Sequence, residues 1–255
     1  MTQQTYAASG SRRIAAQARY EFLTMLRNGE QLMLNIAFPV MGLLALKYTG
    51  FIDGYAASIG TTRMNAAVPG VLALCVLSTA LSGQGIATGF DRRYGVLRFL
   101  STTPLGKSGL IAGKIAAVLG VIAIQFIVVG SLGFALGWRP SLTGLVMALP
   151  TVILGTAAFT ALGLLIAGTV RAEATLAIVN MAWVILAAVG GTLIPGSRLP
   201  GVLSTVVGLL PSGALGHALR AEMLHHQFLI VPHLIIVAWV ALCAGLAIKY
   251  FKWSA

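Results

Sequence analysis

The residue types that could do chemistry in this sequence are scarce, and many of them gather in one segment. Residues 90–114 hold six of the 23 charged residues in about a tenth of the chain: Asp91, Arg92, Arg93, Arg98, Lys107 and Lys114. Charge-free apolar runs flank this segment on both sides, at residues 64–90 and 115–138. A cationic segment between two membrane-length apolar runs is typical of a cytoplasmic loop, because Lys and Arg resist translocation.

The same segment predicts a short amphipathic helix. A helix that begins at Asp91 would place Tyr94, Leu97 and Arg98 on one side, and it would stop at Pro104, because proline forbids continuation. Such a helix at the inner membrane surface is well shaped to dock on a soluble partner. A simpler interpretation is that these charges only fix the orientation of the chain in the membrane.

The usual catalytic and metal-binding motifs are missing from the sequence. Gly106-Lys107-Ser108 resembles the end of a phosphate-binding loop, but the glycine that this motif needs five residues earlier is Ser101. The histidines have no recognisable ligand spacing, so we interpret them as polar residues near the outer membrane interface: His217, His225, His226 and His233. No serine-hydrolase elbow or zinc-protease motif appears. We therefore expect no catalytic residue, metal site or bound cofactor in this chain.

The elements that must position this segment are membrane spans. The chain is 58% hydrophobic and 9% charged, whereas soluble domains carry about 25% charge. An all-α polytopic fold with six spans follows, at residues 31–49, 67–88, 110–136, 140–170, 175–194 and 228–250. Cys75 and Cys243 stand alone within apolar runs, where they are expected to pack as small side chains rather than to form a disulfide.

The net charge of +11 has a topological explanation that needs no nucleic acid. Twelve of the 17 basic residues fall in segments placed on the cytoplasmic side: Arg12, Arg13, Arg19, Arg27, Arg92, Arg93, Arg98, Lys107, Lys114, Arg171, Lys249 and Lys252. This asymmetry is the positive-inside rule. It predicts a multi-pass protein of the plasma membrane (the inner membrane of a bacterium) with both termini in the cytoplasm.

An amphipathic helix is predicted before the first span. Between residues 11 and 28, apolar side chains recur at helical spacing: Ile14, Ala18, Phe22, Met25 and Leu26. Its basic side chains are placed to meet the anionic headgroups of membrane lipid, although a solvated helix without a special role is the alternative. We therefore divide the chain into a cytoplasmic N-terminus with this interfacial helix (residues 1–30) and a six-span membrane domain (residues 31–255).

The apolar run at residues 199–219 decides the topology. Pro200 and Pro211 leave only ten residues between them, about 15 Å of helix against a hydrocarbon core of about 30 Å. A seventh crossing would also place Lys249 outside, against the charge bias. Residues 195–227 are therefore predicted to form a helix-turn-helix that dips into the membrane from the outer face and acts as a gate. Its bends are assigned to Pro200 and Pro211, and Pro195 belongs to the same gate.

Polar residues inside the spans are the candidates for a translocation cavity: Ser78, Ser82, Gln84 and Asn180. Hydrogen bonds between helices, worth only about 0.6 kcal/mol each on average, account for them equally well. The acids lie in loops or near the predicted span ends: Glu21, Glu30, Asp53, Asp91, Glu173 and Glu222. Since ion-coupled carriers usually need an ionisable group deep in the bilayer, a pump of this design would take its energy from a partner.

The order of residues in the central segment resembles the coupling-helix region of ABC-2-type transporter permeases. The resemblance rests on Asp91-Arg92-Arg93, Gly95-Val-Leu, Leu100-Ser-Thr-Thr-Pro-Leu and Gly113-Lys114. Leu199-Pro200, Leu210-Pro211 and Ala218-Leu219-Arg220 resemble the family pattern between its fifth and sixth spans, and Arg220 joins the outer gate on that ground. The resemblance covers nearly the whole chain.

This resemblance implies the permease subunit of an ATP-driven exporter of a lipophilic molecule such as an antibiotic or drug. It implies that separate ATPase subunits carry ATP and Mg²⁺, and that a second copy or a related permease completes the transport unit. The residues implied in ATPase coupling are Asp91, Arg92, Arg93, Tyr94, Gly95, Leu97, Arg98 and Pro104. Export of polysaccharide, lipid or haem, a carrier or channel that works without an ATPase, and a structural membrane subunit remain alternatives.

Overall fold

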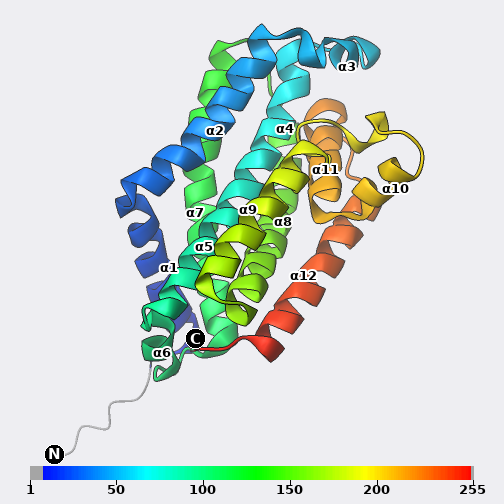
Figure 1. Ribbon diagram of the computed structural model, residues 1–255. Coiled ribbons are helices and arrows are strands. Elements are labelled where there is room, and N and C mark those ends of the chain that lie inside the picture. The colour runs from blue at the N-terminus through cyan, green and yellow to red at the C-terminus, as the bar shows by residue number, and fades with distance from the viewer. Residues whose placement is uncertain (1–7, 254–255) are drawn as a thin grey trace, which may run out of the picture.

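The computed structural model describes residues 8–253, and all regular structure in that range is helical. The long helices lie side by side in one bundle (Figure 1). They are α1 (Gly10–Arg27), α2 (Gly29–Tyr48), α4 (Arg63–Leu77), α5 (Gln84–Arg93), α7 (Gly106–Ala135), α8 (Leu142–Thr169), α9 (Ala172–Ala188) and α12 (Ile230–Tyr250). The first residues of α1, the end of α12 and the loop between α5 and α7 lie at the same end of the bundle.

Shorter elements join these helices. At the end that holds the loop between α5 and α7 lies α6 (Val96–Ser101). The opposite end holds η1 (Gly50–Ile52), α3 (Asp53–Ser58), η3 (Gly196–Arg198) and α10 (Val202–Leu209), and α11 (Pro211–His225) follows α10. Between α4 and α5, the π-helical segment η2 (Ser78–Gly83) keeps the helix continuous from Arg63 to Arg93.

Five helices of the described chain are long and apolar enough to cross a membrane: α2, the continuous α4–α5, α7, α8 and α12. The helix α9 has 17 residues, about 25 Å, which is near the lower limit for a crossing. Helices α10 and α11 are bent by 87° relative to each other. The predicted all-α polytopic fold, with a bent helix pair before the last span, is confirmed. The fifth span was predicted to reach Ile194 but ends at Ala188, before Gly190 and Gly191, and Gly191 has a φ of +85°.

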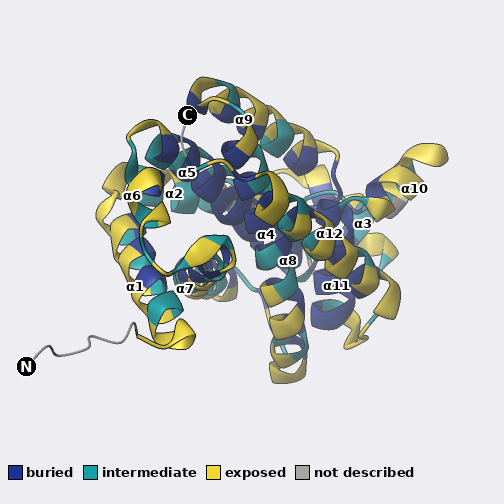
Figure 2. Cartoon of the chain, turned by 90° about the horizontal axis from the view of Figure 1, so that it is seen from below, coloured by how far each residue is buried: buried dark blue, intermediate teal, exposed yellow. Residues whose placement is uncertain are grey.

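The continuous helix α4–α5 forms the centre of the bundle. In its most apolar stretch, 94% of the residues are buried within the chain, because α2, α7, α8, α9 and α11 pack around it. The view along the bundle shows buried residues concentrated on α4 and α5 (Figure 2). A close approach of α5 to α8 fixes this arrangement, since a Cβ atom on Gly85 would lie 3.3 Å from the Cα atom of Gly163.

The predicted N-terminal amphipathic helix is α1, and it packs lengthwise against α7. Gln17 lies against Gly113, and Phe22 lies against Gly120, so the contacts advance in the same direction along both helices. The face that α1 buries against the bundle is partly polar, because Gln17, Glu21 and Met25 are its buried residues. The start of α2 is held beside the centre of the bundle, where Gln31 donates to the carbonyl oxygen of Gly83 at 3.1 Å.

Candidate functional site

The loop between the second and third spans is built around a glycine. Gly95 has a φ of +79°, a left-handed conformation that glycine adopts without strain. The chain therefore breaks between Arg93, where α5 ends, and Val96, where α6 begins. The predicted single helix from Asp91 is wrong in this respect, because helical spacing does not reveal a change of backbone direction at one residue.

Helix α6 presents aromatic and cationic side chains away from the bundle. Leu97 is fully buried against Leu110 and Phe251, so it fixes α6 to the bundle. Tyr94 and Phe99 are 73% and 70% exposed, and Arg98 between them in sequence is also exposed. We call Tyr94, Arg98 and Phe99 the α6 patch. Exposed aromatic side chains grouped with a cation are typical of a protein-binding surface.

The charged residues before Gly95 bind other helices of the same chain. Arg92 is buried and donates from Nη1 to the carbonyl oxygens of Ala167 and Val170, both at 3.0 Å. These carbonyls lie at the C-terminal end of α8, where backbone acceptors lack helical partners and a cation is favourable. Arg93 forms an exposed ion pair with Glu173 of α9. The two arginines therefore hold the end of α5 against α8 and α9.

The other predicted coupling residues also have partners within the chain. Asp91 lies 3.4 Å from Lys114 of α7. Arg13 of α1 donates to the carbonyl oxygen of Pro104, where the loop turns toward α7. Among the predicted coupling residues, Tyr94 and Arg98 have exposed side chains. Arg92 is buried, and Asp91 faces Lys114 of the bundle. Phe99, which the sequence reasoning missed, completes the exposed patch.

A buried charge cluster lies directly behind this loop. The side chain of Lys114 is fully buried, and its Nζ atom lies 2.7 Å from Glu21 and 3.4 Å from Asp91. Gln84 offers a third oxygen at 3.4 Å, and Gln17 donates to Glu21 at 2.8 Å. The three N–H donors of the ammonium group thus have three oxygen partners, which a buried lysine requires. The cluster joins α1, α5 and α7.

The four candidate cavity residues do not share one surface. Ser78 donates to the carbonyl oxygen of Leu74, and Gln84 is buried in the charge cluster. Ser82 donates to the amide oxygen of Asn180 at 3.4 Å, and Asn180 is exposed on α9. Only Ser82 and Asn180 come together where a transported molecule or a second subunit could reach them.

The bent helix pair lies at the opposite end of the bundle. Pro211 is the first residue of α11, and Leu210 before it is extended, so the bend lies at the predicted proline. Arg220 is buried and donates to the carbonyl oxygens of Gly191, at 2.9 Å, and Thr192. It therefore anchors α11 to the turn after α9 and does not face an opening. Pro200 is exposed and precedes α10.

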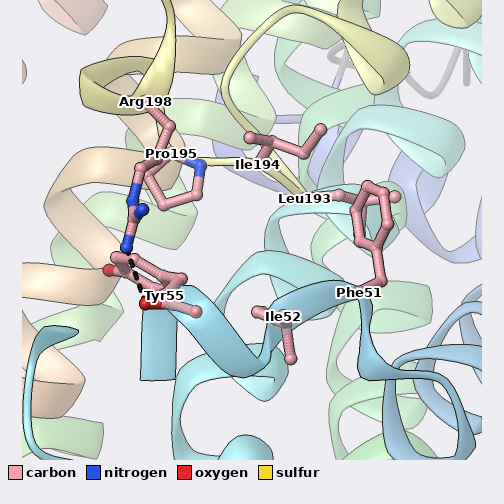
Figure 3. A pocket seen from close by; sticks show the side chains of 8 residues that line it. Phe51, Ile52, Tyr55, Leu193, Ile194, Pro195 and Arg198 are labelled. Atoms are coloured by element: carbon pink, nitrogen blue, oxygen red, sulfur yellow. Dashed lines mark hydrogen bonds between the residues drawn. The ribbon is translucent and has the colours of Figure 1, made fainter. Parts of the chain in front are cut away.

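A cavity of about 230 Å³ lies at the same end, between the segment after α2 and the turn before α10. Pro195 lines it together with Phe51, Tyr55 and Arg198 (Figure 3). Arg198 donates to the carbonyl oxygen of Gly54 at 2.9 Å, as the dashed line in Figure 3 shows. Arg198 thus joins η3 to α3, and the other side chains that line the cavity are mainly apolar.

A second polar cluster is buried beside the bent pair. Glu222 of α11 accepts a hydrogen bond from Thr151 of α8 at 2.7 Å and lies 3.2 Å from His233 of α12. Thr151 is about 14 Å along α8 from its first residue, whereas Glu222 is the fourth residue from the end of α11, so this acid near a helix end is enclosed by packing. His233, interpreted from the sequence as a polar residue near the outer interface, is the fourth residue of α12, and only 6% of it is exposed.

No metal-binding arrangement is found in the part of the chain that the structure describes: residues 8–253 contain no group of three His, Cys, Asp or Glu side chains that could hold an ion. Cys75 and Cys243 are both buried and unpaired. The described geometry is therefore that of a helical membrane bundle with one outward-facing patch and two buried ionic clusters.

Comparison with known families agrees with this architecture. The family model described as ABC-2 type transporter matches residues 12–224, which is most of the chain. The chain belongs to the ABC-2 type transporter family. A search of curated proteins gives no match. This membership makes the chain a multi-pass membrane protein and the permease component of an ABC transporter, a component that is not itself catalytic.

Proposed function

We propose that this permease exports a lipophilic molecule, such as an antibiotic or drug, and is driven by separate ATPase subunits that dock on the α6 patch. The observation that carries the proposal is the position of the exposed Arg98 and Phe99 on a short helix between two spans, with Tyr94 of the same patch just before it. Leu97 fixes α6 to the bundle, so a displacement of Phe99 or Arg98 by a partner moves the ends of α5 and α7 together. ATP and Mg²⁺ are held by the partner.

The charge distribution supports a cytoplasmic location for this end of the bundle. Both described chain ends and the basic loop lie there (Figure 1), and basic segments are retained on the cytoplasmic side of the plasma membrane. The opposite end, with the bent pair, then faces outward. In this orientation the α6 patch is on the side where ATP is available.

A second copy, or a related permease, would complete the transport unit. Asn180 supports this, because it exposes an amide on the apolar helix α9, together with Ser82 of the adjoining π-helical segment. Polar side chains within spans usually face other helices or an aqueous path rather than lipid. We propose that this face meets the second subunit and borders the translocation path.

A carrier that works without an ATPase is the second candidate. The buried Glu222 favours it, since ion-coupled carriers use ionisable groups within the membrane. The two candidates differ in whether a soluble ATPase is required for transport.

The decisive experiment combines Arg98→Glu with Phe99→Ser in the full chain. Both residues are exposed and neither bonds to another helix through its side chain in the described contacts, so the variant is expected to insert and fold normally. It should lose co-purification with the ATPase subunit expressed beside it, because a reversed charge in an interface costs several kcal/mol. Tyr48→Ser, at the opposite end and 75% exposed, is the matched control and should keep the association.

If the double variant retains the ATPase and its transport activity, α6 is not the coupling element. If no ATPase associates with the wild-type chain and reconstituted transport continues without ATP, the carrier without an ATPase is the correct function.

A further inference from the structure

In the cluster of Glu222, Thr151 and His233, the close polar contacts outnumber the hydrogen atoms that an ionised glutamate, a threonine and a neutral histidine supply. The three polar atoms form a triangle: Thr151 Oγ1 lies 2.7 Å from Glu222 Oε1 and 2.8 Å from His233 Nε2, and the third side is 3.2 Å. The side chains come from α8, α11 and α12, so the triangle joins three helices that are separate in sequence.

The number of hydrogen atoms within the triangle depends on whether Nδ1, the second nitrogen of the His233 imidazole, carries the hydrogen of the neutral ring. His233 Nδ1 lies 2.6 Å from the carbonyl oxygen of Leu229, and a carbonyl only accepts, so Nδ1 carries a hydrogen. In a neutral histidine, Nε2 is then an acceptor. With an ionised Glu222, the single hydroxyl hydrogen of Thr151 would have to serve all three contacts, and two pairs of acceptors would face each other. One additional proton, on Nε2 or on the carboxyl group, places a hydrogen between His233 and Glu222 while Thr151 supplies its own, and the third contact of the triangle shares one of these two hydrogens.

The second oxygen of Glu222 points to the same conclusion. Glu222 Oε2 is buried and has no hydrogen-bond partner among the described residues. An ionised carboxylate with an unpartnered buried oxygen is much more costly than a neutral carboxyl or one paired with a cation.

Few other charges face the site from the helices that pack on α11, which are α4, α8, α10 and α12. Helices α8 and α10 carry no charged residue, and α12 carries His233 near its start and Lys249 near its end. On α4, Arg63 is paired with Asp53. On α11 itself, Arg220 is bound to Gly191 and Thr192, and the remaining titratable side chains are the exposed His217 and His225.

We propose that Glu222, Thr151 and His233 form a proton-binding site that fastens the bent helix pair to α8 and α12. While the proton is bound, the triangle is satisfied and the C-terminal part of α11 is held. When the proton leaves, a carboxylate faces two acceptors in an apolar surrounding, and α11 separates from α8. The site is independent of ATPase docking at the opposite end of the bundle.

The site lies close to the surface of the chain. Phe228 stacks on the imidazole of His233 with ring centroids 3.9 Å apart. Phe228 and Leu229 also line an apolar groove of about 570 Å³ bordered by α10, α11 and α12. A change at His233 is thus passed directly to the wall of this groove.

The direct test is the protonation state of the purified full chain in lipid nanodiscs at about pH 8, where ordinary histidine is neutral and ordinary glutamate is ionised. Infrared spectroscopy reports a protonated carboxyl group, and NMR of ¹⁵N-histidine reports an imidazolium. We expect one of these two signals. A protonated carboxyl signal should disappear in Glu222→Gln, and an imidazolium signal should disappear in His233→Asn. An ionised Glu222 together with a neutral His233 at this pH would overturn the proposal.

The consequence for stability gives a second readout. Because the folded state binds a proton that the unfolded chain does not hold at this pH, stability falls as pH rises, by up to about tenfold in the folded-to-unfolded ratio per pH unit for as long as the folded state keeps the proton. Glu222→Gln should flatten this dependence, and His225→Gln, on the exposed side of α11, should leave it unchanged. An equal slope in the wild type and in Glu222→Gln would contradict the site; if that variant does not fold, the wild-type spectra decide.

Discussion

The ammonium group of Lys114 lies 2.7 Å from a carboxylate oxygen of Glu21, and both side chains are buried. This ion pair connects α1 to α7, and Asp91 extends it to the end of α5. The first helix of the chain is therefore attached to the same group of residues that supports the loop carrying α6. The loop that carries α6 and the first helix are thus joined through charge contacts and not only through the chain connection.

Removal of the lysine should destabilise the bundle strongly. Lys114→Met leaves Glu21 and Asp91 as buried carboxylates without their cation, and breaking a buried pair in this way costs about 3–5 kcal/mol. The free energy of unfolding in a denaturing-detergent titration measures the effect. Lys114→Met combined with Glu21→Gln should recover part of the loss.

The exposed ion pair between Arg93 and Glu173 provides the control for that experiment. Because solvent screens it, Arg93→Gln should change the unfolding free energy by only about 0–1 kcal/mol. Equal effects of Lys114→Met and Arg93→Gln would show that the buried cluster contributes little.

The contact between α5 and α8 should not tolerate a methyl group. A Cβ atom on Gly163 would lie 2.9 Å from the carbonyl oxygen of Leu81 and 3.2 Å from the Cα atom of Gly85. Both neighbours are backbone, so Gly163→Ala forces the helices apart, at a cost of about 1–3 kcal/mol. Gly245→Ala meets nothing within 4 Å, and it should be neutral or stabilising because alanine favours helix. Melting temperatures of the two variants in one detergent compare them directly.

The sequence was sufficient to predict the helical class, the approximate spans and the bend near Pro211, because apolar length and proline act locally. The break at Gly95 was missed because the same residues also satisfy a continuous helical pattern. The inward direction of Arg92 and the enclosure of Glu222 depend on partners in α8 and α12 that are distant in the sequence. Hydropathy places Glu222 near a predicted end, whereas only packing shows that it is enclosed.

A cysteine-accessibility experiment tests the orientation. Arg98→Cys and Lys252→Cys, at the α6 end of the bundle, should react with a membrane-impermeant thiol reagent only from the cytoplasmic side. Ser58→Cys, on α3 at the opposite end, should react only from outside. The native cysteines are buried and should give little background. Labelling of all three positions from one side would contradict the orientation proposed here.

Pro211→Ala should affect the bend more than assembly. A residue before proline avoids the helical region, so alanine at position 211 frees Leu210 to join α10 and α11 into a straighter helix. Spin labels at Val202 and Leu142, both exposed, should then report a broader distance distribution. Pro200→Ala, outside any helix, should leave that distribution unchanged. Loss of membrane insertion in Pro211→Ala would instead identify the segment as ordinary scaffold.

The enclosure of α4–α5 has a consequence for biosynthesis. This helix leaves the ribosome second among the spans, yet α7, α8, α9 and α11, which cover it, are all translated later. Until α11 has been made, part of the surface that ends in the interior remains in contact with lipid or with the insertion machinery. The last third of the chain therefore completes the burial of the helix at Arg63–Arg93, and chains truncated before Pro211 leave part of that helix uncovered.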